Sequence, residues 1–447
     1  MNTLKIKKGP ILLPLLILLV GLSVYTFFSF RGVSAADSIS LGQQYLNEMN
    51  YDGAVSAFAE AMERDPNSKD ARIGLAQAYA GTEEYNFAQE LLSDMVYVQH
   101  PNEEASKVLI DIMNGSGQEH QAISVVEDLI QTTDKEEYYE LREELLTERY
   151  GDTRRSLAVG VDHTMIIRDG AVFARGSNTL GQLGIAPSSE VTEAFVSANF
   201  AGTPIKVACV GRTSLVIDAN GDLWAAGENR WGQMGEGYAT TDPQAGWSQI
   251  PCVLPVVDVT GTPGRLLVLM NDGSLWSAGA GSQQTLQRMS SFPVVLEIAA
   301  NQRKAAVLTS GGQLYTSDST TPDVWTLAAE NVSTFTLSED SLCWIGERNT
   351  IGTDYWNLSV PDDWYNGSDV VAQIPVRSVA SADGITLFTA NGVLYHLPGD
   401  GSIKEVPSST PVVTLYSESD VLVVEHEDGS VSYWNYETNM LKPIETF

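Results

Sequence analysis

Cysteine and histidine are scarce in this chain of 447 residues, and each scarcity excludes a class of site. Three cysteines (Cys209, Cys252 and Cys343), with no C-x-x-C pair, are too few for a disulfide framework or a cysteine-rich metal site. We expect the three cysteines to be small buried side chains, although a disulfide between Cys209 and Cys252 is the alternative if the body lies outside the cytoplasm. The five histidines are dispersed, and the sequence contains no H-E-x-x-H, P-loop or G-x-S-x-G motif. The sequence therefore predicts no catalytic residue, no cofactor and no metal.

Basic residues are also few, with 26 Lys and Arg against 57 Asp and Glu and a formal net charge of −31. Residues 1–35 contain four of these bases (Lys5, Lys7, Lys8 and Arg31) and no acid, so the rest of the chain carries 22 − 57 = −35. A body this acidic repels phosphate backbones, which excludes nucleic acid as an expected partner. The same charge favours basic protein partners.

One long hydrophobic run stands near the N-terminus. Residues 11–30 contain no charge, and a helix of that length can span a bilayer. Three lysines precede the run, so the N-terminus should stay cytoplasmic and the body should be extracytoplasmic. The sequence therefore predicts a single-pass anchor in the cell membrane. The alternative is a secreted chain, cleaved after Ala35, because Val33-Ser34-Ala35 resembles a signal-peptidase site.

From residue 36 to about residue 136 the apolar pattern repeats every 34 residues. Within each unit the apolar positions step by three and four, which predicts two amphipathic helices. Each pair leaves one apolar face uncovered, so three pairs must stack. The equivalent positions are Ala54, Ala88 and Ala122; Phe58, Leu92 and Val126; Leu41, Leu75 and Leu109; Tyr45, Tyr79 and Met113; and Ala61, Met95 and Leu129.

These positions resemble the tetratricopeptide repeat. Its signature falls on Leu41-Gly42, Tyr45, Tyr51, Ala54, Phe58, Ala61 and Pro66, while Ser38 replaces the first-helix Trp. The resemblance implies that a concave groove binds extended peptides or partner helices. An amphipathic stretch over 136–149 is expected to cap the stack. The expected groove residues are Ile39, Gln43, Leu46, Ile73, Gln77, Lys107 and Asp111.

From residue 156 onward, apolar and polar residues alternate in short runs separated by Gly, Asp and Asn turns, a pattern that predicts β-hairpins. A turn-plus-strand mark recurs seven times in 292 residues, or about 42 residues each, the length of a four-stranded propeller blade. The turns begin at Gly170, Gly221, Gly273, Gly312, Asp340, Gly392 and Gly429.

The first two of these units share a longer motif. Gly176-Ser-Asn-Thr-Leu-Gly-Gln-Leu-Gly184 returns 51 residues later as Gly227-Glu-Asn-Arg-Trp-Gly-Gln-Met-Gly235. Together with Val159-Gly160 and His163-Thr164, the motif resembles the regulator-of-chromosome-condensation repeat. The resemblance implies a seven-bladed propeller over 156–447 and an internal hydrogen-bonding role for His163.

Two loops carry aromatic residues that we predict as partner-binding anchors, because exposed aromatics supply large contact areas at low entropy cost. Residues 235–251 contain Tyr238 and Trp247, and a second loop contains Trp356, Trp364 and Tyr365. Packing against the next blade is the competing interpretation of these rings. Asp218-Ala-Asn-Gly-Asp222 is interpreted as a hairpin turn and not as a calcium loop.

The sequence thus predicts a multidomain α and β chain: an N-terminal transmembrane helix, an α-solenoid of helix pairs and an all-β seven-bladed propeller. The expected domains are 1–35 (cytoplasmic stub and anchor), 36–136 (three repeats), 137–155 (capping helix and linker) and 156–447 (propeller). We expect a non-enzymatic extracytoplasmic scaffold that binds protein partners. A carbohydrate- or cell-wall-binding module is the alternative, and an envelope enzyme built from convergent loop residues is a further one.

Overall fold

The structure is a computed structural model that divides into two compact units, Met1–Ser116 and Gly117–Phe447. It describes residues 34–98, 100–116, 118–151, 155–279, 283–339, 341–346, 351–355, 376–382, 385–390, 392–397, 404–418 and 421–444. No helix within these ranges is both long and apolar enough to cross a membrane. The anchor predicted at residues 11–30 lies outside the described residues, as do Trp356, Trp364 and Tyr365.

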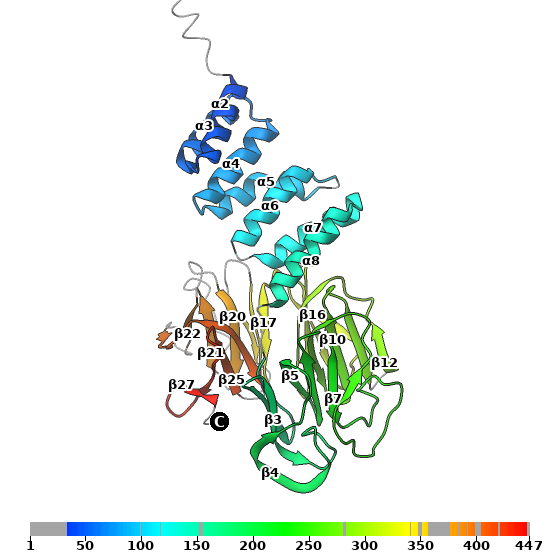
Figure 1. The fold of residues 1–447 in the computed structure, drawn as a ribbon. Coiled ribbons are helices and arrows are strands. Elements are labelled where there is room, and N and C mark those ends of the chain that lie inside the picture. The colour runs from blue at the N-terminus through cyan, green and yellow to red at the C-terminus, as the bar shows by residue number, and fades with distance from the viewer. Residues whose placement is uncertain are drawn as a thin grey trace, which may run out of the picture. The chain divides into compact units, whose positions relative to one another are not determined.

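The helices of the first unit follow the 34-residue offset closely. Helices α2, α4 and α6 begin at Ala35, Lys69 and Glu103. Neighbouring helices pack side by side in chain order (Figure 1). The helix-pair architecture is therefore confirmed. The full bounds are α2 (Ala35–Asn47), α3 (Tyr51–Arg64), α4 (Lys69–Gly81), α5 (Tyr85–Val96) and α6 (Glu103–Gly115).

Side-chain caps explain why the first helix of each repeat begins at the same repeat position. Ser34, Ser68 and Asn102 stand one position before α2, α4 and α6, and each side chain accepts a hydrogen bond from a backbone N–H of the first turn. Such a cap satisfies one of the donors that a helix start leaves unpaired. The caps also recur at the 34-residue offset, so each first helix begins at the same place in its repeat.

The centre of the first unit is the ring of Phe58, which is 1 % exposed. A Cβ atom at Gly42 would come within 2.8 Å of this ring, and one at Gly74 within 2.3 Å. The two glycines thus let neighbouring helices close over the ring. Equivalent positions differ in burial: Leu75 and Leu109 are buried, but Leu41 is 40 % exposed. It lies on α2, the first described helix, and has no earlier described helix pair against it.

The second unit begins with two helices, α7 (Glu119–Thr133) and α8 (Glu136–Gly151). They pack together and share an ion pair between Arg142 and Glu127 at 3.1 Å. The end of α8 is fixed to the propeller. The Tyr150 hydroxyl donates to the carbonyl of Val295 at 2.5 Å, and Arg149 pairs with Glu297. The helix predicted over 136–149 is therefore confirmed.

The rest of the second unit contains seven antiparallel sheets, each a meander in chain order. The first four are β1 (Leu157–Val159), β2 (His163–Arg168), β3 (Ala171–Asn178), β4 (Ser188–Ser197); β5 (Pro204–Val210), β6 (Thr213–Asp218), β7 (Leu223–Gly227), β8 (Ser248–Ile250); β9 (Val256–Thr262), β10 (Arg265–Met270), β11 (Leu275–Gly279), β12 (Gln283–Arg288); and β13 (Val295–Ala300), β14 (Lys304–Thr309), β15 (Leu314–Asp318), β16 (Trp325–Ala329). The last three are β17 (Thr334–Leu337), β18 (Ser341–Ile345), β19 (Ile351–Tyr355); β20 (Val376–Ala382), β21 (Ile385–Ala390), β22 (Val393–Leu397), β23 (Lys404–Val406); and β24 (Val412–Glu418), β25 (Val421–His426), β26 (Val431–Asn435), β27 (Met440–Pro443).

The first strand of each sheet contacts the first strand of the next, and β24 returns to β1, so the sheets form a closed ring. Six sheets are complete four-stranded blades, and the sheet of β17, β18 and β19 has three strands within the described residues. The propeller architecture is confirmed, with six complete blades where the sequence predicts seven. All six of the predicted turn glycines have a positive φ: Gly170, Gly221, Gly273, Gly312, Gly392 and Gly429.

Hydrogen bonds from β24 and β25 close the ring onto the start of β1. The hydroxyl of Tyr416 accepts from the N–H groups of Ser156 and Leu157, each at 3.2 Å, and donates to Glu425 at 2.8 Å. The Ser156 N–H also donates to Glu425 at 2.6 Å. The first and last blades are therefore joined by a buried polar cluster as well as by apolar packing.

Candidate functional site

The two signature loops follow β3 and β7, and a buried asparagine holds each of them. Asn178 is 1 % exposed; its Oδ1 accepts from the Leu183 N–H at 3.0 Å and its Nδ2 donates to the Ala186 carbonyl at 2.7 Å. Asn229 binds the N–H of Met234 at 3.1 Å and the carbonyl of Tyr238 at 3.2 Å. The repeated asparagine is therefore the polar centre of its loop, which a sequence motif alone does not reveal.

The signature glycines let the first loop approach the segment before β8. Gly181 and Gly184 both have positive φ. A Cβ atom at Gly181 would lie 1.7 Å from the Gln244 carbonyl oxygen, and one at Gly184 would lie 2.4 Å from Nε1 of Trp247. The Gln244 N–H also donates to the Leu180 carbonyl at 3.0 Å. Larger residues at either position would push the two loops apart.

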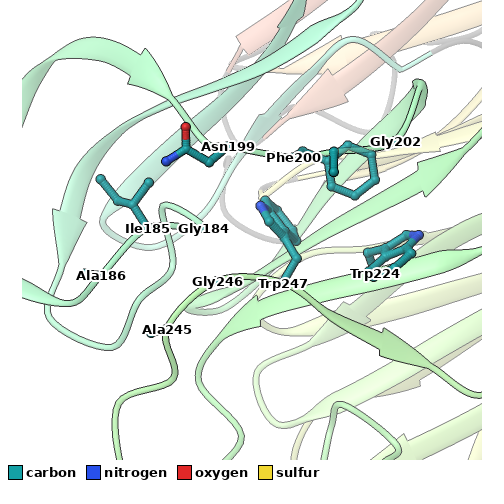
Figure 2. A pocket seen from close by; sticks show the side chains of 11 residues that line it. Gly184, Ile185, Ala186, Asn199, Phe200, Gly202, Trp224, Ala245, Gly246 and Trp247 are labelled. Carbon is teal, nitrogen blue, oxygen red and sulfur yellow. The ribbon is translucent and has the colours of Figure 1, made fainter.

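A pocket of about 710 Å³ opens between these loops, at the outer end of the contact between the first two blades (Figure 2). Its walls come from the β3–β4 loop, the β4–β5 connection, β7 and the segment before β8. Most of the wall is apolar or glycine. The lining residues are Gly184, Ile185, Ala186, Asn199, Phe200, Ala201, Gly202, Trp224, Ala245, Gly246 and Trp247.

Three half-buried aromatic rings form the centre of the pocket wall (Figure 2). The Phe200 ring lies 5.9 Å from that of Trp224 and 5.5 Å from that of Trp247, with an interplanar angle of 79° in both pairs. Both indole N–H groups are bonded within the protein. Trp247 donates to the Ala198 carbonyl at 2.8 Å, and Trp224 donates to Asp218 at 3.1 Å. The rings therefore present carbon surface to the pocket and not hydrogen-bond donors.

A similar trio occurs in the fourth blade. Phe292 precedes β13 just as Phe200 precedes β5, and its ring lies 5.5 Å from Tyr315 and 5.1 Å from Trp325. The trio is thus a repeated element of blade packing. Around the first trio, the β3–β4 loop and the segment before β8 approach each other through their glycines, and the pocket lies beside the rings.

The structure places the predicted binding residues in several separate regions. Trp247 lines the pocket and also packs against the core between the first two blades, and its role as a partner-binding anchor stays a prediction. Tyr238 is 46 % exposed, and its hydroxyl interacts with Glu236. In the first unit, Gln43 and Lys107 are exposed, while Ile39 and Gln77 are half-buried.

Sequence analysis did not identify Phe200 and Trp224 as site residues. The signal for Trp224 was present, because it belongs to the repeated Leu-Trp lead-in of the strand. Phe200 stands alone in a connection between blades, and its two aromatic neighbours lie 24 and 47 residues further along the chain. The contacts that join them are set by the fold of the second blade, because Phe200 precedes β5, Trp224 lies on β7 and Trp247 directly precedes β8.

A histidine with hydroxyl, thiol and carboxylate neighbours lies at the contact of the first two blades. Nε2 of His163 is 2.8 Å from Ser214 Oγ and 3.4 Å from Cys209 Sγ, and Nδ1 is 3.6 Å from Asp162. Yet Ser214 is fully buried and donates to the Gln182 carbonyl at 2.5 Å. Burial also raises the pKa of the Cys209 thiol well above its ordinary value. The hydroxyl and thiol are therefore not activated, and the internal bonding predicted for His163 is confirmed.

The three cysteines form no disulfide and belong to no metal-ligand cluster within the described residues. Cys209, Cys252 and Cys343 are free thiols. Within the described ranges no group of three or more His, Cys, Asp or Glu residues lies together as metal ligands would. Asp218 Oδ1 accepts from the N–H groups of Asn220 and Asp222, so this segment is a turn, as predicted.

A smaller cavity of about 40 Å³ lies where the innermost strands end, around the ring axis. Glu418 lines it, 3.7 Å from the Arg155 guanidinium, which also lies over the Tyr416 ring. Burial raises the pKa of Glu418 to about 7, although Arg155 opposes the shift. This cavity is too small for more than a water molecule or two, so the aromatic pocket is the better candidate for binding.

Comparison with known proteins agrees with both halves of this architecture. The family model described as tetratricopeptide repeat matches residues 45–109. Protein RCC2 of Homo sapiens is 35 % identical over 82 residues, which is 18 % of this chain and 16 % of the human protein. Protein RCC2 of Mus musculus is 36 % identical over 80 residues, 17 % of this chain and 15 % of the mouse protein. The chain thus covers about a sixth of the length of these relatives.

The crystal structure of human WBSCR16 matches 62 % of this chain and 87 % of its own, with a TM-score of 0.50 and 15 % sequence identity. At that identity the likeness concerns the fold. Together, the observed architecture and the comparisons identify a tetratricopeptide-repeat-like helical region joined to a propeller of the regulator-of-chromosome-condensation type.

Proposed function

We propose that this protein is a non-enzymatic interaction scaffold, and that its propeller binds a protein partner at the aromatic pocket between the first two blades. The observation that supports this most directly is the pocket itself, because its three half-buried rings can supply an anchor site for a partner side chain. The helical repeats provide a second surface, on which Gln43 and Lys107 are exposed.

Two features favour binding over catalysis. Beside His163, the Ser214 hydroxyl is fully buried and donates to the Gln182 carbonyl, and burial raises the pKa of the Cys209 thiol. The aromatic pocket is lined by rings, glycine, alanine, Ile185 and Asn199, and none of its eleven lining residues is ionisable. Such a lining can hold a ligand but offers no general acid or base.

We further propose that residues 11–30 anchor the chain in the cell membrane and that the two units lie outside the cytoplasm. The uncharged run and the preceding lysines support this arrangement. Protease added to intact cells should then remove the propeller and leave a membrane-bound N-terminal fragment. Protection of the propeller until the cells are lysed would contradict the orientation.

Site-specific photo-crosslinking in the full chain tests the scaffold. A crosslinking residue replaces Ala245 at the pocket or Gln43 in the helical groove, and Val324, an exposed residue in the fourth blade, is the matched control. We expect position 245 to give a protein adduct whose yield saturates and falls when unlabelled protein is added as a competitor. Position 324 should give a lower yield of that adduct. Equal labelling from all three positions would contradict the proposal.

A carbohydrate- or cell-wall-binding surface is the second candidate, because half-buried indoles also stack on sugars. Purified wall polymer should then bind the full chain and lose binding when Trp247 is replaced by Ala. The pocket wall, with its indole donors already bonded, makes this function the less favoured one.

A further inference from the structure

The electrostatic surroundings of the aromatic pocket indicate which kind of side chain it binds. Residues 171–264, from the start of β3 to the turn after β9, contain the pocket and its supporting strands. They contain eight acidic residues (Glu190, Glu193, Asp218, Asp222, Glu228, Glu236, Asp242 and Asp258) and four bases (Arg175, Lys206, Arg212 and Arg230), a net charge of 4 − 8 = −4. The net charge around the pocket is therefore negative and favours a cation.

One of these carboxylates lies directly behind the pocket wall. Asp218 is 4 % exposed, and its Oδ2 accepts the hydrogen bond from the Trp224 indole at 3.1 Å. A Cβ atom at Gly202, a lining residue, would lie 3.3 Å from the same oxygen. The absence of a side chain at Gly202 lets this carboxylate and the Phe200 ring, whose nearest atom would lie 2.9 Å from such a Cβ, both approach the pocket wall closely.

Several polar groups of the wall are bonded within the protein, which disfavours anions and sugars. Both indole N–H groups are bonded, the Gly184 N–H donates to the Gly181 carbonyl, and the Ala186 carbonyl accepts from Asn178. Apart from the exposed Asn199 amide, the side chains of the wall present aromatic and aliphatic surface near a buried negative charge. A cation with an apolar stem matches this surface, because its charge is attracted to ring faces and its stem packs against them.

We propose that the pocket binds an arginine side chain of a basic protein partner, with the guanidinium against the rings of Trp224 and Trp247. This inference rests on the proposed function and specifies the chemistry of its partner. Arginine fits better than lysine because a planar guanidinium stacks on aromatic faces and gives up its hydration more easily. The pocket volume of about 710 Å³ exceeds one side chain, so neighbouring residues of the partner enter with it.

Blocked alanine-rich hexapeptides with one central arginine, citrulline or norleucine test the proposal on the full-length protein. Citrulline keeps the shape of arginine but removes its charge, and norleucine keeps only an apolar stem. The readout is the shift of the Trp224 and Trp247 indole N–H signals in ¹⁵N NMR spectra. We expect the arginine peptide to bind in roughly the millimolar range and at least about tenfold more tightly than the citrulline peptide.

Two variants of one residue separate the ring from its hydrogen bond. Trp247→Phe and Trp247→Leu both lose the bond to the Ala198 carbonyl, but only Phe keeps an aromatic face. We expect Trp247→Phe to bind the arginine peptide nearly as wild type does and Trp247→Leu about tenfold more weakly. The Trp224 indole signal reports in both variants that the neighbouring wall is intact.

Equal affinity for the arginine and citrulline peptides would overturn the proposal, as would equal binding by the two Trp247 variants. Tighter binding of norleucine would show an apolar pocket and also overturn it. Each of these results leaves the scaffold untouched if position 245 still crosslinks a partner. Loss of the crosslink with retained arginine binding would instead contradict the scaffold alone.

Discussion

Replacing Asn178 by Ala should open the loop that forms one wall of the aromatic pocket. The substitution removes two buried hydrogen bonds, one from the Leu183 N–H at 3.0 Å and one to the Ala186 carbonyl at 2.7 Å. A hydrogen bond contributes about 1 kcal/mol net, and an unpaired buried group costs about 1–3 kcal/mol. We therefore expect the local opening free energy to fall by about 2–4 kcal/mol.

Native-state hydrogen exchange measures this quantity directly, because protection of an amide reports its local opening. The Leu183 amide should exchange roughly a hundredfold faster in Asn178→Ala than in wild type, since each 1.4 kcal/mol is about a factor of ten. Amides of β13 and β14, on a distant blade, should keep their protection. Binding at the pocket should weaken, because Gly184 and Ile185 belong to the loosened loop.

Asn229→Ala is the matched control, since Asn229 is equally buried and makes the equivalent bonds in the second loop. We expect it to deprotect Met234 by a similar factor and to leave ligand binding at the pocket nearly unchanged. Unaltered exchange at Leu183 would refute the role assigned to Asn178. Equal weakening of binding by the two variants would refute the placement of the site.

Three further predictions concern other parts of the chain. Burial raises the pKa of Glu418 from 4.5 to about 7, so the stability that its protonated form contributes is complete below pH 4.5 and is lost as the pH rises through 7. Glu418→Gln should abolish this pH-dependent loss, which amounts to up to about 3 kcal/mol. The melting temperature of the propeller should then depend less on pH between pH 5 and 8. Phe58→Ala should destabilise α2–α5 by about 3–5 kcal/mol in denaturant titrations followed by helical circular dichroism, whereas the exposed Phe87→Ala should change little. Tyr150→Phe should cost about 1 kcal/mol of protection in α8, measured by hydrogen exchange, because the Val295 carbonyl loses its donor; unchanged protection would argue against docking of α8.

Local patterns in the sequence predicted much of the fold. The 34-residue offset placed the helix pairs because caps and core alanines recur with it, and turn glycines placed the hairpins because the required positive φ belongs to the glycine itself. The repeat position did not predict the exposure of Leu41, because burial at the start of a stack depends on neighbouring helices. The blade count depends on pairings of strands whose motifs have decayed after residue 280.

The candidate site was only partly predictable. Trp247 could be identified from its position in a long loop, but the pocket requires Phe200 and Trp224, which meet it through the fold of the second blade. The docking of α8 joins Tyr150 to Val295 across 145 residues of sequence. Contacts of this kind join residues far apart in the chain, and a local sequence motif does not encode them.

The central claim is that a partner binds at the pocket between the first two blades. Hydrogen exchange of the full chain, compared with and without the partner captured from position 245, measures the footprint of binding. We expect the partner to add protection centred on residues 184–186, 199–202 and 245–247. Exchange around Phe292, Tyr315 and Trp325 in the fourth blade should stay unchanged. Protection confined to the helical repeats or to other blades would contradict the claim.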